Sequence, residues 1–102
     1  MNDNDVVVEA WNTVLFDKFS RFKHLIVAGL SGHSDELLSR RLYRAGERVL
    51  DVGCGFGDTT IRIAGEVGPT GQAVGVDCAE NFVRASEQDA LAAGVRNASF
   101  FA

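Results

Sequence analysis

Three glycines stand at alternate positions in the stretch VLDVGCGFGDTT, which runs from residue 49 to residue 60. Glycine adopts positive φ angles at little cost and has no Cβ, so its backbone can approach another molecule closely. The stretch begins with an apolar run and ends with the start of a predicted helix, whose free N–H groups favour a negatively charged group nearby. Gly53, Gly55 and Gly57 therefore predict a ligand-binding loop, because a tight turn alone would need fewer glycines.

The elements around this loop alternate between strand and helix. They are an apolar run at 49–52, a helix at 58–68, an apolar run at 73–77, a helix at 80–93 and a further strand at 97–102. Both apolar runs lack a polar face, which is typical of a parallel sheet with helices on both faces. Right-handed crossovers then gather the loops after successive strands at one end of the sheet. We predict an α/β fold with a Rossmann-like βαβαβ unit over residues 47–102.

Residues 1–46 predict an N-terminal helical cap. One helical face carries an aromatic stripe, with side chains at spacings of three or four: Trp11, Leu15, Phe19, Phe22 and Ile26. Such a stripe indicates packing on a core, and a lid over a bound ligand is the alternative, with Trp11 as its candidate residue. A second, short helix is expected to begin with Ser34 or Asp35 as its N-cap and to end at Gly46.

The composition argues against several classes of function. The 102 residues suffice for one domain, and a formal net charge of −4 gives no general attraction to nucleic acid or anionic lipid. No run reaches the roughly 18 apolar residues of a membrane span, and the N-terminus lacks the features of a secretory signal. We therefore expect a cytoplasmic protein with neither nucleic acid nor membrane as partner. Two cysteines are too few for a zinc site, and no metal is expected.

The spacing of the glycines separates two classes of cofactor. The dinucleotide fingerprint is G-x-G-x-x-G, and its third glycine position holds Asp58 here. The observed pattern is G-x-G-x-G instead. The stretch VLDVGCGFGDTT resembles the first motif of the class I S-adenosylmethionine-dependent methyltransferases, and AVGVD, which ends in Asp77, resembles their second motif. The resemblance covers residues 48–102.

This resemblance implies a cofactor site built from the glycine loop and two acids. Gly53, Gly55 and Gly57 would pass beside the methionine and ribose parts of S-adenosylmethionine. Asp77 would accept hydrogen bonds from the 2′ and 3′ hydroxyls of the ribose, which an ionised carboxylate at the end of the sheet can reach. Asp51 lies inside the apolar run, where a carboxylate is unfavourable without hydrogen bonds. We expect it to bond to loop amides and to lie near the amino group of the cofactor.

The resemblance also assigns residues to the adenine side of the site. Cys78 and Ala79 follow Asp77 at the adenine-side positions, and Phe82 in the next helix either contacts adenine or, as we favour, packs in the core. Cys54 lies between two glycines of the loop and belongs to the same cofactor site. A nucleophilic cysteine needs a base partner, and neither histidine has a motif around it, so catalysis by a thiol is not expected.

The family resemblance implies direct transfer of a methyl group from S-adenosylmethionine to a small-molecule acceptor. In that reaction the cofactor supplies the reactivity and the protein supplies alignment. No residue has a context that identifies it as a catalytic base. Two alternatives remain: a fragment of an NAD-type dinucleotide-binding oxidoreductase, and a non-catalytic nucleotide-fold module that binds a partner chain.

The resembled family has a seven-stranded sheet, whereas this sequence ends as a third strand begins. We therefore expect a Rossmann-like sheet truncated after the start of its third strand, from a longer enzyme. The strand at 49–52 would then leave one edge unpaired, and an unpaired apolar edge favours association. Self-association through this edge is the second expectation.

Overall fold

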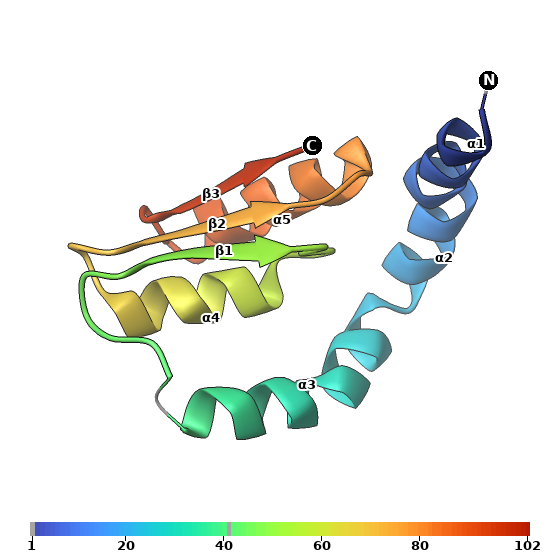
Figure 1. The fold of residues 1–102 in the computed structure, drawn as a ribbon. Helices are drawn as coiled ribbons and strands as arrows, with labels where there is room; N and C mark the ends of the chain where they lie inside the picture. The colour runs from blue at the N-terminus through green and yellow to red at the C-terminus, as the bar shows by residue number, and fades with distance from the viewer. Residues whose placement is uncertain (1, 41) are drawn as a thin grey trace.

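The fold, taken from a computed structural model that describes residues 2–40 and 42–102, joins N-terminal helices to a small parallel sheet (Figure 1). The elements follow in the order α1 (Asp3–Ala10), the π-helical turn η1 (Trp11–Leu15), α2 (Phe16–Arg21), α3 (Lys23–Ser39), β1 (Arg48–Val52), α4 (Asp58–Val67), β2 (Gln72–Val76), α5 (Glu80–Ala92) and β3 (Ala98–Phe101). The predicted βαβαβ unit is confirmed, and its strands and helices lie within one or two residues of their predicted bounds.

The three strands are parallel and lie in the order β1-β2-β3. Val52 of β1 pairs with Val76 of β2, which in turn pairs with Phe101 of β3. The carboxyl ends of all three strands therefore lie at one end of the sheet, and they point toward α1 and α2 (Figure 1). The glycine loop and Asp77 follow β1 and β2 at that end.

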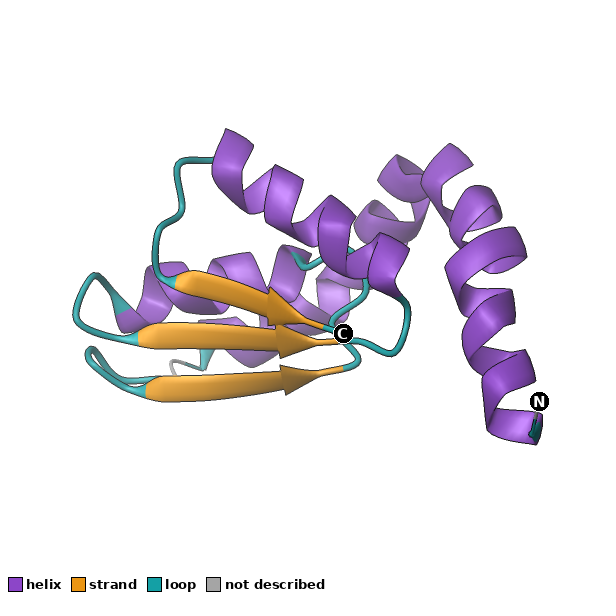
Figure 2. Cartoon of the chain, turned by 90° about the horizontal axis from the view of Figure 1, so that it is seen from above, coloured by secondary structure: helices purple, strands orange, loops and turns teal. Residues whose placement is uncertain are grey.

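The helices α4 and α5 lie against one face of the sheet, α3 contacts α4, and α1 and α2 lie beyond the carboxyl ends of the strands (Figure 1). Figure 2 looks onto the opposite face, and the helices lie behind or beside the strands. On that open face Leu50 is 62% exposed and Val52 is 74% exposed, whereas Ala73 on the helix side is 1% exposed. The expectation of helices on both faces is therefore met on one face only within residues 2–40 and 42–102. An apolar run predicts a buried strand without saying which element covers each side.

The core on the helix side is closed by contacts at the carboxyl end of α4. Ile63 and Val67 of α4 are buried against Ala73 of β2. The side-chain Nδ2 of Asn97 donates to the carbonyls of Ala64, at 2.9 Å, and Gly68, at 2.8 Å. The Ala64 carbonyl also accepts from the amide of Gly68, the C-cap residue, at 3.2 Å, so Asn97 gives it a second donor and binds the carbonyl of the C-cap residue itself.

The helix α3 differs from its prediction at both ends. It runs without a break through Ser34 and Asp35, so neither residue is an N-cap, and it ends before the predicted stop at Gly46. Tertiary contacts explain the difference: Leu38 is buried in the core, and Asp35 forms an ion pair with Arg62 of α4. Gly46, with φ of 86°, lies in the turn before β1.

The aromatic stripe is interrupted at Phe22. This residue has φ of −112° and ψ of 19°, which ends α2, and its side chain is 50% exposed rather than packed. The prediction of one continuous face is wrong there, because the 3.6-residue period holds only along an unbroken helix. Trp11 and Phe19 do pack on the core, and Phe16, which the stripe omitted, packs with them. None of the described helices is long and apolar enough to cross a membrane.

The open edge of β1 generates the first prediction. Because Leu50 and Val52 expose apolar side chains on this edge strand, we expect the chain to self-associate as its concentration rises. Leu50→Lys should weaken the association, since a lysine on an edge strand opposes pairing, and sedimentation velocity over a concentration series measures it. Leu91→Lys is the matched control, because Leu91 is 82% exposed on α5. A monomer at every concentration, with β1 amides protected from hydrogen exchange, would contradict the prediction.

Candidate functional site

A cleft of about 500 Å³ lies at the carboxyl ends of the strands. Its walls come from the glycine loop, from the start of α4, from the segment after β2 and from the N-terminal helices. Six of the residues that the sequence assigns to a cofactor line it: Gly53, Cys54, Gly55, Asp77, Cys78 and Phe82. The other three, Asp51, Gly57 and Ala79, lie outside the lining, and Ala79 is completely buried.

The three glycines of the loop have different surroundings. All have positive φ, at 73° for Gly53, 56° for Gly55 and 78° for Gly57, so each occupies a conformation that other residues rarely adopt. A Cβ added at Gly53 or Gly55 would meet no atom within 4 Å, whereas one added at Gly57 would lie 2.8 Å from the side chains of Phe100 and Ser86. The first two glycines thus leave room beside the cleft, and the third makes room for neighbouring side chains.

Asp77 joins the end of β2 to the glycine loop. Its Oδ2 accepts a hydrogen bond from the Gly55 amide at 3.0 Å, and its Oδ1 accepts one from the Ala79 amide at 3.0 Å. Each oxygen of an ionised carboxylate has two acceptor positions, so both retain capacity for a further donor. The sequence predicted a ligand role for Asp77 but not its hydrogen bond to Gly55. The two residues are 22 positions apart, and only the fold brings them together.

Asp51 has a different partner from the one expected. Its Oδ2 accepts from the hydroxyl of Thr60 at 2.7 Å, and Thr60 is completely buried in α4. We expected Asp51 to bond to amides of the glycine loop, but the loop amides of Gly53 and Cys54 donate to the carbonyl of Val76, at 2.8 and 2.9 Å. Asp51 therefore connects β1 to α4, and its expected position near the cofactor's amino group stays a prediction.

An aromatic cluster forms the floor of the cleft. Phe82 is 3% exposed, and its ring centroid lies 4.9 Å from that of Phe56 and 5.1 Å from that of Phe16. Trp11 meets Phe82 edge-on with a centroid distance of 6.3 Å. Phe82 thus packs in the core, as favoured, and also lines the cleft. Sequence reasoning missed Phe56, which lies, like Cys54, between two glycines of the loop and is 6% exposed.

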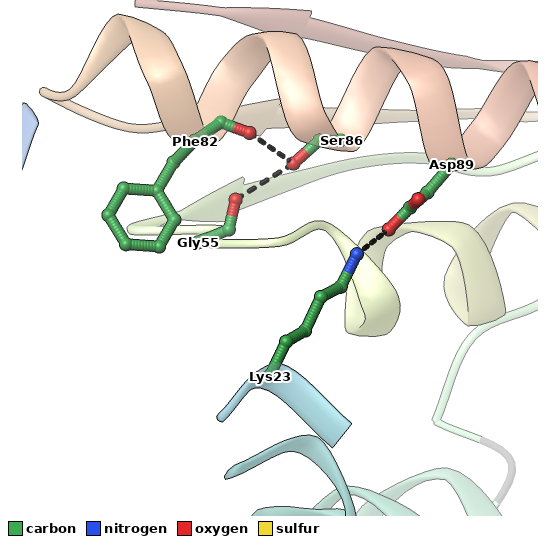
Figure 3. Close-up of polar contacts among 5 residues, drawn as sticks. All are labelled: Lys23, Gly55, Phe82, Ser86 and Asp89. Carbon is green, nitrogen blue, oxygen red and sulfur yellow. Dashed lines mark hydrogen bonds and ion pairs between the residues drawn. The ribbon is translucent and has the colours of Figure 1, made fainter. Parts of the chain in front are cut away.

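Three polar contacts, two hydrogen bonds and an ion pair, hold the N-terminal helices on α5. The backbone amide of Asn81 donates to Asn12 Oδ1 at 2.8 Å, and Asn81 Nδ2 donates to the Asn12 carbonyl at 2.6 Å. Lys23 forms an ion pair with Asp89 (Figure 3) and lies 4.8 Å from the ring centroid of Phe56.

The two cysteines differ in exposure. Cys54 is 7% exposed, and burial raises the pKa of its thiol to about 11, with the charges of Asp77 and Asp51 adding to the increase. A protonated thiol is a poor nucleophile, so this pKa makes Cys54 unsuited to nucleophilic attack. Cys78 is exposed at the rim of the cleft. Among the described residues, no three histidine, cysteine, aspartate or glutamate side chains gather where they could hold a metal ion.

The raised pKa of Cys54 generates the second prediction. At pH 8 the folded chain should react at Cys78 and spare Cys54, because a thiol of pKa about 11 is then about one part in a thousand thiolate. Titration with a chromogenic disulfide reagent, followed by peptide mapping, identifies the modified residue. Denaturant should make both thiols reactive, and rapid labelling of Cys54 in the folded chain would refute the prediction.

Known proteins share this arrangement of loop and strands. A family profile described as "Methyltransferase domain" matches residues 44–102. The demethylmenaquinone methyltransferase of Geobacillus stearothermophilus is 39% identical over 62 residues, which are 61% of this chain and 26% of that protein. The demethylmenaquinone methyltransferase of Staphylococcus aureus strain JH9 is 44% identical over 45 residues, or 44% of this chain and 19% of that protein.

Solved structures match over a similar span. A methyltransferase from Aquifex aeolicus that is described as SAM dependent superposes with a TM-score of 0.61 and 25% identity, covering 67% of this chain and 36% of that chain. TrmN from Thermus thermophilus gives a TM-score of 0.61 and 31% identity over 67% of this chain and 20% of that chain.

The chain spans about a quarter of the length of the curated relatives it matches, with 26% and 27% coverage of the two Geobacillus proteins. The profile, however, covers more than half of this chain, and it includes the glycine loop, Asp77 and all three strands. The chain therefore belongs to the methyltransferase domain family, within the class I S-adenosylmethionine-dependent methyltransferases.

Proposed function

We propose that this chain is the S-adenosylmethionine-binding part of a methyltransferase that moves a methyl group to a small-molecule acceptor by direct displacement. The observation that carries the proposal is the open space at Gly53 and Gly55, where an added Cβ would meet no atom of the protein within 4 Å. Both glycines line the cleft beside Asp77. This combination offers a strip of bare backbone next to a carboxylate, which suits a ligand that carries a ribose.

The residues of the cleft fit the parts of this cofactor. The backbone at Gly53 and Gly55 would pass beside its methionine and ribose portions, and Asp77 would accept from the ribose hydroxyls. Cys78 at the rim and Phe82 in the floor would hold the adenine. When bound, the cofactor supplies a methyl group on a sulfonium, which is already a good leaving group.

The acceptor side of the cleft would be formed by the N-terminal helices. Their contribution to the lining is apolar and partly aromatic: Trp11, Phe19, Ile26, Val27 and Leu30. Such a wall excludes water and favours an apolar acceptor. The names of the Geobacillus and Staphylococcus relatives support the same class of acceptor, since demethylmenaquinone is a small molecule. Trp11 packs on the core and also lines the cleft, so the alternative role as a lid residue stays part of the proposal.

The alternative dinucleotide-binding function is disfavoured by Asp58. This residue replaces the third glycine of the dinucleotide fingerprint, begins α4 and lines the cleft. A dinucleotide places its pyrophosphate at the start of that helix. The carboxylate of Asp58 would repel the pyrophosphate there, whereas S-adenosylmethionine carries no phosphate.

Calorimetric titration with S-adenosylhomocysteine and, separately, with NAD tests the proposal. We expect saturable binding of S-adenosylhomocysteine and none of NAD. Asp77→Ala should weaken the binding about tenfold or more, because it removes a charged acceptor from the ribose and a bond from the glycine loop. Glu66→Ala is the control, since Glu66 is exposed on α4 away from the cleft lining.

Each other result has a defined meaning. Binding of NAD in place of S-adenosylhomocysteine would favour the oxidoreductase alternative. Binding of neither ligand would refute the proposal for this chain and favour the non-catalytic module. Equal weakening by Asp77→Ala and Glu66→Ala would remove the ribose role of Asp77.

A further inference from the structure

Hydrogen bonds hold the backbone on both sides of the Gly55 Cα. The amide before this atom donates to Asp77 Oδ2 at 3.0 Å. The carbonyl after it accepts from the hydroxyl of Ser86 at 2.8 Å (Figure 3). Because one bond orients each of the two peptide groups that flank the Cα, the pair together fixes the φ and ψ of Gly55. Asp77 is part of the expected site, whereas Ser86 has been assigned no role.

Ser86 lies completely buried in the middle of α5. Its hydroxyl oxygen is 2.9 Å from the carbonyl of Phe82, one turn earlier in the same helix. A serine inside a helix commonly bonds to such a carbonyl. The Gly55 carbonyl lies at a similar distance, 2.8 Å, so the single hydroxyl proton can be donated to either the helix or the glycine loop.

The loop also surrounds the Ser86 side chain from a second direction. A Cβ added at Gly57 would lie 2.8 Å from both Cβ and Oγ of Ser86. Gly57 does not line the cleft, so its lack of a side chain serves the contact with α5 rather than direct access of a ligand. The carbonyl of Gly55 and the Cα of Gly57 thus enclose one small hydroxyl side chain.

We propose that Ser86 is a positioning residue for cofactor binding, which acts through the Gly55 carbonyl. Its hydroxyl holds the peptide after Gly55 so that the bare backbone at Gly53 and Gly55 faces the cleft. Ser86 does not line the cleft and would not touch the cofactor itself. This inference rests on the proposed function, because it takes the cleft as the site of S-adenosylmethionine.

The substitution Ser86→Ala in the 102-residue chain tests the inference. Alanine leaves the packing space at Gly57 intact and favours helix more than serine does, so the melting temperature should change little. The dissociation constant for S-adenosylhomocysteine should rise about fivefold, because a loop released from this hydrogen bond must be ordered again when the ligand binds. Ser39→Ala is the matched control, because the Ser39 hydroxyl also donates to a carbonyl of its own helix, that of Glu36 at 2.7 Å, on the exposed surface of α3.

The outcomes separate a positioning role from a structural one. Weaker binding with an unchanged melting temperature, and no effect of Ser39→Ala, is the expected result. A lower melting temperature with unchanged affinity would assign Ser86 to stability and overturn the inference, as would no effect on either quantity. Ser86→Cys places a weak hydrogen-bond donor in a similar volume. We expect its affinity for S-adenosylhomocysteine to lie between those of the wild type and Ser86→Ala. If Ser86→Ala fails to fold, Ser86→Cys takes its place in the experiment.

The proposed function and this inference fail in different ways. Absence of S-adenosylhomocysteine binding by the unsubstituted chain refutes the proposed function. Hydrogen exchange at the Gly55 amide then tests whether Ser86 positions the loop. Faster exchange in Ser86→Ala than in Ser39→Ala supports this role, and equal exchange opposes it.

Discussion

The hydrogen bond between the Gly55 amide and the Asp77 carboxylate is the contact on which the arrangement of the site depends. It joins the loop after β1 to the end of β2 at 3.0 Å. A bond of this type, with a charged acceptor, contributes about 1.5 to 3 kcal/mol. The parallel register brings the two segments together, since Val52 and Val76 are paired at the last step of the ladder. The sheet thus places an acid beside the glycine loop, and the acid in turn fixes the loop.

The N-terminal helices complete the cleft through α5. Three residues of α5 make these contacts. Phe82 packs in the aromatic cluster, Asn81 bonds to Asn12, and Asp89 pairs with Lys23. The ion pair is partly exposed and contributes little to stability, whereas edge-on aromatic pairs add about 0.5 to 1.5 kcal/mol each beyond burial. The aromatic contacts therefore set the position of the helices, and the polar contacts define their register on α5.

The sequence predicts the strands, the helices after them and the position of the cleft, because these depend on local signals. The apolar runs and glycine turns lie within a few residues of the elements that they specify. Local signals could not predict that Thr60 bonds to Asp51 or that Ser86 bonds to Gly55, because only the packing of the folded chain brings these residues together. The break at Phe22 was also missed, because the same residues at the same spacing would suit a continuous helix. The extent of α3 was missed because its contacts with α4 outweigh a local capping signal.

The contacts that attach the N-terminal helices join residues far apart in the chain. Asn12 and Asn81 are separated by 69 residues, and Lys23 and Asp89 by 66. The connections between successive strands of the sheet are much shorter, so their pairing closes smaller loops and loses less chain entropy. We therefore expect the helices α1 and α2 to dock after the sheet has folded and to open before the sheet unfolds. Residue-resolved hydrogen exchange would display this order as earlier exchange in α1 and α2 than in β2, and equal protection of both would exclude it.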